Sequence, residues 1–348
     1  MASQLNRFLC GCGASQYGQL LCSEVRTEPV IINREEFFFK DNDIIMVQAG
    51  RWSTAVLLKG DKVFLYGNII NIEGLCDKNL LINPESGGTE FFNISKIAIG
   101  DEHLILLGNN GQILAFGNVA NSYREHIMGK IVNVFAKFDK SAFVMENNRV
   151  LITNYAKGNI TIEFSSQVKD VALTASSFGV LSQDALYIFD DEGQMMFEIE
   201  NIVSVAASEN IFIILKNNSA VFELLESGKT RQIHGIDGVA IKVFAGSNHY
   251  GVITLDGECW MWGCGLFGQL GSGKKEYASI PEKTKIKVGY RVIDVHAGEC
   301  HSIFLITKDN TFSHKIPEEM KTSDYIKVVN TTFLVSGSLI ASQYDYKF

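Results

Sequence analysis

The sequence predicts an all-β protein, a β-propeller of seven or eight blades, and three observations support this prediction. First, residues 8–20 (FLCGCGASQYGQL) and 259–271 (CWMWGCGLFGQLG) are nearly the same segment at opposite ends of the chain. Second, a unit of three short apolar runs recurs between them. Third, no stretch has the periodicity of a long amphipathic helix. Self-similarity of this kind is typical of solenoids and propellers.

The repeated unit consists of an apolar run, a small residue, a few polar residues, a second run, a turn and a third run. The runs are short, rich in Val, Ile and Phe, and bounded by Gly, Asn and Asp, which predicts strands. Four copies are clear, at 44–68, 94–118, 240–264 and 291–315, and three weaker ones lie at 131–153, 168–189 and 202–224. Their small residues align as Gly50, Gly100, Ala136, Ala172, Ala207, Gly246 and Gly298.

Repeated antiparallel sheets must protect their edges, and closure into a ring does so. Residues 8–13 match the third run of a unit, but no first or second run precedes them. We expect residues 325–342 to supply those two strands, so that the N- and C-terminal strands pair and close a single domain over residues 1–348. The copies then number eight if all are true, and periodicity alone permits seven or eight.

Composition and charge exclude several classes of function. The net charge of -8 opposes phosphate, and no basic patch compensates, so we expect no direct binding of nucleic acid. Seven scattered cysteines without a secretion-type segment indicate reduced thiols, and no apolar run is long enough for a membrane helix. We therefore expect a protein of the cytoplasm, the nucleus or both, with no membrane contact.

Three histidines occupy the same position of the repeat, three residues after the glycine: His103, His249 and His301. Three imidazoles can bind zinc, but equivalent positions in different blades lie around a ring and need not converge. We interpret them, with Gly50, Gly100, Gly246 and Gly298, as structural residues of the repeat, each histidine bonded to nearby backbone. The prediction is therefore no metal at these positions.

The glycine-rich segment GCGLFGQLG superficially resembles a phosphate-binding loop. Such a loop must lead into a helix, whereas here a strand precedes and a loop with Pro281 follows. Tight turns explain the glycines, and we expect Leu266, Phe267 and Leu270 to pack the loop onto the neighbouring blade. Cys10 and Cys12 fall on one face of a strand and are read as buried small side chains. No cofactor is predicted.

Catalytic motifs are missing from the sequence: it has no Ser-His-Asp order, no HExxH and no paired-carboxylate motif. We therefore expect no enzyme with covalent or metal chemistry of its own. The loops between first and second strands emerge on one face of a propeller, and aromatic and charged side chains there suit a protein-binding surface. The candidate residues are Arg51, Trp52, Asp101, Glu102, Phe138, Phe178, Asn248, Tyr250 and Glu299.

An alternative is that these aromatic side chains pack between blades rather than face a partner. A second candidate surface comprises two longer connections, at residues 34–43 and 69–93, because the FFF of the first is apolar enough to require cover.

The segment WGCGLFGQLGSG with downstream Pro281, followed by VIDVHAGECHSIFLIT, resembles the regulator of chromosome condensation (RCC1) repeat. The likeness is strong over residues 240–310, good over 5–118 and weak in the middle third. It implies a seven-bladed propeller, with eight as the alternative, and the chain looks like the stand-alone propellers of the family. Those bind partner enzymes, such as a jumonji-type oxygenase or a small metal protein serving diphthamide synthesis and tRNA modification.

The function we expect is therefore a non-enzymatic scaffold or adaptor that binds and regulates a protein partner, either a small GTPase or an enzyme subunit. The alternative from the same family is a guanine-nucleotide exchange factor for a Ran-like GTPase. The lack of a basic N-terminal tail and the loss of the repeat pattern in the middle blades disfavour exchange on chromatin. A propeller enzyme with a bound metal is a third class.

Overall fold

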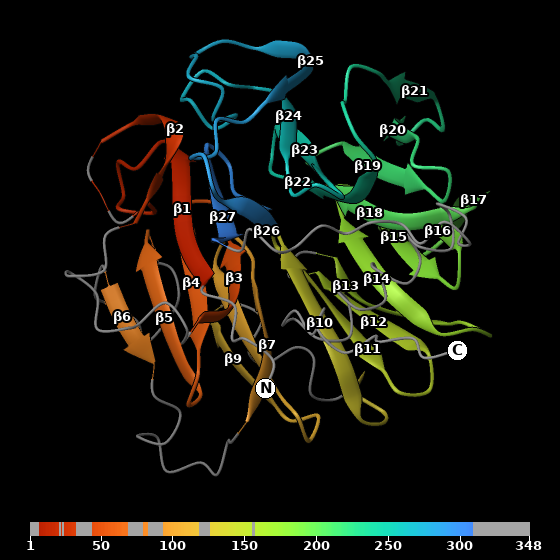
Figure 1. Ribbon diagram of the computed structural model, residues 1–348. Helices are drawn as coiled ribbons and strands as arrows, with labels where there is room; N and C mark the ends of the chain where they lie inside the picture. The colour runs from red at the N-terminus through yellow and green to blue at the C-terminus, as the bar shows by residue number, and fades with distance from the viewer. Residues whose placement is uncertain are drawn as a thin grey trace, which may run out of the picture.

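A ring of seven antiparallel sheets forms the protein, as the computed structural model in Figure 1 shows. The structure describes residues 7–32 except 21 and 23, 44–68, 79–82, 93–117, 126–154 and 157–308. Strands and turns make up these residues, and no helix among them could span a membrane. The all-β, seven-bladed propeller is thus confirmed.

We number the blades from the first complete sheet, and in each blade the first strand named is the innermost. Blade 1 contains β3 (Ile44–Ala49), β4 (Ser53–Leu58), β5 (Lys62–Gly67) and β6 (Asn79–Ile82). Blade 2 contains β7 (Ile94–Ile99), β8 (His103–Gly108) and β9 (Ile113–Gly117). Blade 3 contains β10 (Ile131–Lys137), β11 (Lys140–Met145), β12 (Arg149–Asn154) and β13 (Gly158–Glu163). Blades 4 and 5 contain β14 (Val168–Leu173), β15 (Ser177–Ser182), β16 (Ala185–Asp190) and β17 (Met195–Glu200); β18 (Ile202–Ala207), β19 (Ile211–Lys216), β20 (Val221–Leu225) and β21 (Thr230–Ile233). Blades 6 and 7 contain β22 (Ala240–Ala245), β23 (His249–Thr254), β24 (Cys259–Gly263) and β25 (Ala278–Lys283); β26 (Arg291–Ala297), β27 (His301–Thr307), β1 (Arg7–Gly13) and β2 (Arg26–Ile31).

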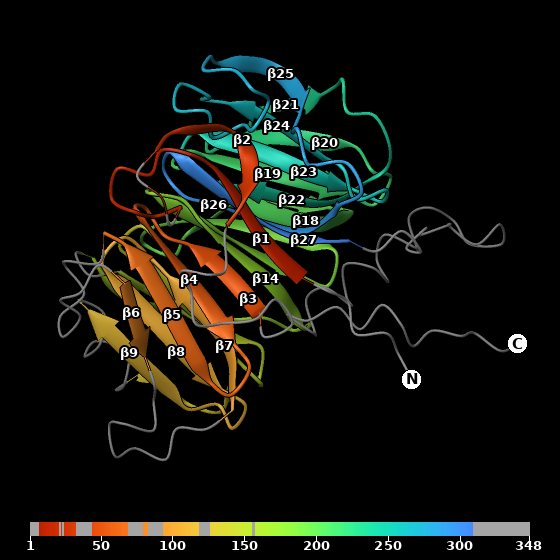
Figure 2. The same ribbon diagram turned by 60° about the vertical axis from the view of Figure 1, so that its left-hand side comes forward.

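Blade 7 closes the ring by combining both ends of the described chain. Strand β1 pairs with β27 from Arg7 opposite Thr307 to Gly13 opposite His301, and its other edge pairs with β2. Figure 2 shows β1 lying between these two strands. Closure by N- and C-terminal strands is therefore correct, but the strands at residues 291–307 provide it.

The expectation that residues 325–342 would supply the missing strands is wrong. Residues 311–315 resemble a third run in the sequence, but β1 occupies the third-strand position beside β27. Counting that copy and residues 8–13 as one blade gives seven blades and removes the eighth. Residues 311–315, 325–342 and the candidate surface at 34–43 lie outside the described residues, as does the connection at 69–93 apart from β6 and residue 93.

The first strand of every blade contains a β-bulge, which corrects the alignment of the repeat. In blade 1 the register shifts between Ile44 and Met46, and the N–H of Gly50 then donates to the carbonyl of Ser53. The same closing bond joins Thr174 to Ser177 in blade 4. The positions equivalent to Gly50 are therefore Gly100, Lys137, Thr174, Ser208, Gly246 and Gly298.

Ala136, Ala172 and Ala207 thus precede the equivalent position by one or two residues. The middle blades have Lys137, Thr174 or Ser208 in place of the glycine, so an alignment of small residues selects the nearby alanine instead. A bulge is a conserved local device that re-aims a side chain, and here it sets which side chains of each first strand face the central channel.

The hydrophobic core consists of layers between adjacent blades rather than one central mass. Between blades 1 and 2, for example, Leu57 and Leu65 pack against Ile97 and Leu104, all with 0–2% exposure. Burying each such side chain contributes about 1.5–3 kcal/mol. Each blade therefore depends on its neighbours for cover, and this dependence fixes the loops of successive blades relative to one another.

Candidate functional site on the loop face

The candidate site lies on the face of the ring that carries the connections between first and second strands, which we call the loop face. A series of backbone hydrogen bonds joins these connections across blade boundaries. The N–H of Glu299 donates to Arg51, that of Asp101 to Phe138, and that of Ser247 to Gly298, at 2.9 to 3.1 Å. The loops therefore form a rigid collar on which side chains can be presented without a large ordering cost.

The repeat histidines lie below this collar and join neighbouring blades. His249 Nε2 is 2.9 Å from the hydroxyl of Ser302 in the next blade, and that hydroxyl donates to the carbonyl of Gln269 at 2.9 Å. Because the hydroxyl hydrogen is used on Gln269, the histidine must donate, which places its proton on Nε2. His301, Thr54 and Gln19 repeat this arrangement at the next boundary.

His103 makes the corresponding contact with Ser141 at 2.8 Å. All three histidines are buried, so the structural interpretation fits, and each contacts a hydroxyl group as well as the backbone of the next blade. Burial lowers the pKa of His103 and His301 to about 4 and that of His249 to about 3. These imidazoles are therefore neutral at pH 7.

The glycine three residues earlier makes room for each imidazole ring. A Cβ atom on Gly246 would lie 2.4 Å from Cε1 of His249, and one on Gly298 would lie 2.2 Å from Cε1 of His301. In blade 3 the glycine is replaced by Lys137, and the histidine by Lys140, whose buried ammonium pairs with Asp191 of blade 4. Blade 3 thus keeps the contact between neighbouring blades while changing its chemistry.

The two segments that are nearly identical in sequence occupy the same place in blades 7 and 6. Gly13 and Gly263 have φ values of 105° and 95°, and a Cβ atom there would lie 2.3 and 2.6 Å from a backbone oxygen, so only glycine fits. Leu20 and Leu270 are buried, whereas Tyr17 and Phe267 are 43% and 42% exposed. Each segment therefore anchors a loop and presents one aromatic ring.

The expected packing role was right for Leu270 and wrong for Leu266 and Phe267, which are 59% and 42% exposed. The reason is that the loop turns tightly, so only one side of it can contact the neighbouring blade. Tyr17 was not among the candidates, yet its ring makes an edge contact with Trp52 at 5.4 Å. Its repeat equivalence to Phe267 was the signal that could have identified it.

Charged side chains surround the centre of the loop face. Arg51 donates through Nε to Glu299 and lies 3.5 Å from Asp101, and its guanidinium also stacks near Trp52. Burial raises the pKa of Asp101 to about 6, although Arg51 opposes the rise. The seven connections contain one arginine and five carboxylates, which are Asp101, Glu102, Asp139, Glu209 and Glu299. Sequence reasoning missed Asp139 and Glu209, both exposed.

Two predicted surface residues are corrected by their burial. Phe178 is fully buried and stacks on Phe189, and Tyr250 is 8% exposed and packs near Trp262. Both follow the histidine position within a second strand, where alternate side chains point into the layer between blades. The alternative that aromatics pack between blades holds for these two, while Trp52 and Phe138 are half-buried and Asn248 is exposed.

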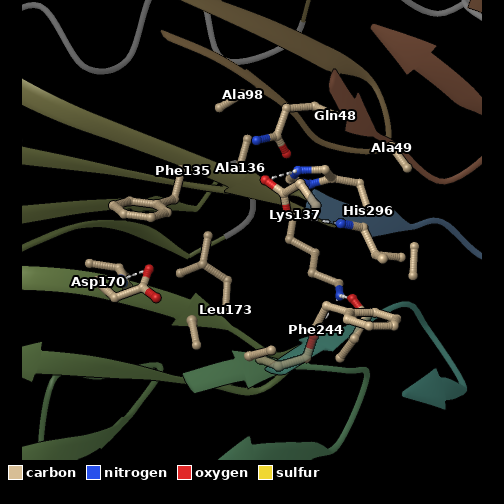
Figure 3. Close-up of a pocket in the computed structure, with 18 of the residues that line it drawn as sticks. Gln48, Ala49, Ala98, Phe135, Ala136, Lys137, Asp170, Leu173, Phe244 and His296 are labelled. Carbon is tan, nitrogen blue, oxygen red and sulfur yellow. Dashed lines mark hydrogen bonds and ion pairs between the residues drawn. The ribbon is translucent and has the colours of Figure 1, made fainter. Parts of the chain in front are cut away.

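Lys137 lies beneath the collar at the centre of the ring and links three blades by hydrogen bonds. Its Nζ donates to the carbonyls of Ala207, Ala245 and Gly246, at 2.8 Å for Ala245, and so reaches from blade 3 to blades 5 and 6. Burial lowers its pKa to about 7. Figure 3 shows the side chain crossing the centre of the ring toward Phe244. The small hollow above it, about 20 Å³, is lined by Arg51, Asp101 and Phe138.

Metal-binding chemistry is not indicated in the described part of the chain, where no three His, Cys, Asp or Glu side chains group as ligands. Cys10 and Cys12 are buried, and burial raises both thiol pKa values, which makes them unreactive. The loop face therefore offers rigid geometry, charge and exposed aromatic rings, which are the elements of a binding surface.

Comparison with known proteins agrees with this geometry. Residues 256–305 and 240–269 match two descriptions of the regulator of chromosome condensation (RCC1) repeat. Human E3 ubiquitin-protein ligase HERC2 is 36% identical over 75 residues, which is 22% of this chain and 1% of the ligase. The ultraviolet-B receptor UVR8 of Arabidopsis thaliana is 34% identical over 74 residues, which is 21% of this chain and 17% of the receptor.

Solved structures extend the likeness over most of the ring. Human WBSCR16 superposes with a TM-score of 0.70 at 16% identity, covering 86% of this chain and 99% of the other. Prp20p of Saccharomyces cerevisiae superposes with a TM-score of 0.69 at 16% identity, covering 93% and 94%. Residues 240–305 thus match the RCC1 repeat, and the described ring has the seven-bladed fold of RCC1-like β-propellers.

Proposed function

We propose that this protein is a binding scaffold whose loop face receives a basic segment of a protein partner. The observation that supports this most directly is the charge of the loop connections, one arginine against five carboxylates on a rigid collar. Complementary charge of this kind speeds association and rejects partners of the wrong sign. Regulation of that partner is part of the proposal, because a scaffold without catalytic groups acts by occupying or positioning what it binds.

Asp101 is the group that gains most from a cationic partner. Its carboxylate is partly withdrawn from water, and its nearest cation, Arg51, is at 3.5 Å and is shared with Glu299. A lysine or arginine of the partner above the small hollow would compensate this charge. The exposed ring of Tyr17 contacts Trp52 beside Arg51, and Phe267 is exposed at the equivalent position of blade 6. Both can act as aromatic anchors, which supply much of the energy of protein interfaces.

Relatives of the same fold support a protein partner as the class of ligand. The solved structure of Prp20p is described with binding to Gsp1p and histones, and another structure shows yeast Prp20 bound by Kap60. The matching proteins share only the fold at this level of identity, so the identity of the partner rests on experiment.

The test is affinity capture from cells with the wild type and with a charge-reversed variant, Asp139→Lys combined with Glu209→Lys. Both side chains are exposed, so the fold should persist. The matched control is Glu146→Lys with Glu200→Lys, which makes the same net change at exposed sites away from the loop face. We expect the loop-face variant alone to lose the partner, and wild-type binding to weaken with salt. Equal capture by all three proteins would contradict the proposal.

A second candidate function is guanine-nucleotide exchange on a Ran-like GTPase, favoured by the likeness of the ring to Prp20p. An exchange assay with purified GTPases decides between the two. Release of bound nucleotide accelerated about a hundredfold or more would favour exchange over a simple scaffold, while unchanged release would favour the scaffold. We also propose residence in the cytoplasm, the nucleus or both, which fluorescence imaging of the tagged protein tests.

A further inference from the structure

The centre of the ring contains a cavity that the proposed function does not use. It has a volume of about 270 Å³ and is lined by the first strands of the blades. At the loop face Lys137 and the tightly packed glycines close it, and a Cβ atom on Gly298 would lie 2.5 Å from the oxygen of Gly50. The bulge residues begin the same strands, so they line the opposite end. The cavity is a funnel closed at the loop face.

Six bulge-position residues border the funnel, and they carry both signs of charge: Met46, Lys96, Asn133, Asp170, Lys242 and Asp294. Lys242 pairs with Asp294 at 2.6 Å, and His296 lies 3.4 Å from the same carboxylate. Those charges satisfy one another.

The other two charges are not paired directly. Lys96 Nζ donates to the neutral amide of Asn133 at 2.8 Å, which leaves two of its hydrogens for another acceptor. The carboxylate of Asp170 accepts the backbone N–H of Val171 at 2.9 Å, and no cation of the described residues lies within 4.0 Å of it. One ammonium and one carboxylate thus border the same cavity without a direct ion pair, although each favours the charged form of the other from a distance.

Apolar and polar groups line the funnel in comparable amounts. Phe135, Leu173 and Phe244 line it together with several alanines, and Gln48 adds one amide, as Figure 3 shows. The volume falls just below the roughly 300–1,000 Å³ of pockets for drug-sized ligands, so it suits a small metabolite. Small-molecule sites usually combine apolar walls with a few placed polar groups, and this funnel has the apolar side chains together with a larger share of polar groups.

We propose that this funnel binds a free α-amino acid with an apolar side chain. The ammonium group of the ligand pairs with Asp170, its carboxylate pairs with Lys96, and its side chain packs against Phe135 and Phe244. A simple anion would approach Asp170 and Asp294, and a simple cation would approach Lys96 and Lys242. Only a ligand that carries both charges meets a partner for each, and charge-assisted hydrogen bonds of this type are the strong ones.

The electrostatics of the unfilled funnel agree with this geometry. Burial raises the pKa of Asp170 to about 7 and lowers that of Lys96 to about 8, so each charged form is held at a cost. A zwitterion in contact with both would favour both charged forms, because an opposite charge nearby offsets desolvation. Paired shifts of this kind in a cavity are typical of functional sites.

The test is isothermal titration calorimetry of the full chain with leucine, methionine and phenylalanine as probes. Two analogues of phenylalanine separate the charges: phenethylamine lacks the carboxylate, and 3-phenylpropionate lacks the ammonium. We expect at least one amino acid to bind and both analogues to bind at least tenfold more weakly. Absence of binding by every probe at millimolar concentration, or equal binding of either analogue, would overturn the proposal.

Variants locate the site independently. Asp170→Asn and Lys96→Met should each weaken amino-acid binding at least tenfold, while Asp256→Asn, at an exposed turn, should leave it unchanged. Circular dichroism and thermal melting establish that each variant is folded before its titration is read. Wild-type affinity in both funnel variants would refute the assignment, and if either variant fails to fold, the analogue series on the wild type decides alone.

Discussion

Stability should fall between pH 7 and pH 4 because the three buried histidines stay neutral in the folded ring. Their folded pKa values, about 3 to 4, lie below the value of 6.5 for an unperturbed histidine. Between these values the histidines are protonated in the unfolded chain but not in the folded chain, so a lower pH favours unfolding. Each histidine should therefore lower the free energy of unfolding at pH 5 by about 2 kcal/mol compared with pH 8.

The assay is urea denaturation of the wild type and of His301→Gln at pH 8, 6.5 and 5. Glutamine retains an N–H that can reach Thr54 but does not titrate. The stability advantage of the wild type over this variant should shrink by about 2 kcal/mol from pH 8 to pH 5. Asp101 and Asp170 have raised pKa values and act in the opposite direction, but they are common to both proteins. His234→Gln, at an exposed site, is the control.

An advantage of the wild type over His301→Gln that stays constant from pH 8 to pH 5 would refute the reasoning, because it would mean that His301 titrates alike in both states. A similar narrowing in the His234→Gln control would do the same, since that side chain is exposed.

Three further predictions concern the contacts between blades. Asp191→Asn should destabilise the protein by about 3–5 kcal/mol because it leaves the buried ammonium of Lys140 without its partner. Lys140→Met should destabilise it less, because Lys157 still pairs with Asp191. Equal shifts of the urea midpoint in the two variants would contradict this order. Deletion of residues 1–13 removes β1 from between its two neighbours and should abolish cooperative thermal unfolding, so a truncated protein that melts sharply would show the idea to be wrong. Gly263→Ala forces a side chain into a backbone oxygen and should lower the melting temperature measurably, with Gly289→Ala, at an open position of similar φ, as the comparison.

The fold could be predicted from the sequence because strand patterning survives even where the RCC1 consensus is lost. The repeat position could not be aligned in the middle blades, since Lys137 and Thr174 replace a glycine and only the bulge reveals their equivalence. The bulge leaves no residue-type signature, because its side chains range from Met46 to Asp294. The count of blades depended on which strand pairs with β1, and apolar runs of similar length cannot be distinguished by pattern alone.

Only part of the candidate surface could be predicted, because the exact ends of the second strands are not visible in the sequence. The loop positions of Arg51, Asp101 and Glu299 follow from the repeat, and the structure brings them together. Phe178 and Tyr250 belong to the second strands, and a shift of one residue in a strand exchanges the two faces of the sheet. Asp139 and Glu209 occupy equivalent loops, so counting the charges of every loop would have added both to the candidates.

The closure of blade 7 has a consequence for how the chain could be rewired. Arg7 and Thr307 face each other in an antiparallel pair, so residues at the two ends of the described ring are neighbours. A two-residue hairpin turn joining residues 307 and 7 would convert this long-range pairing into a local one. New termini could then be opened in the connection between any two other blades. Each circular permutant would close its ring at a different place. Their relative stabilities would measure each junction of the ring separately.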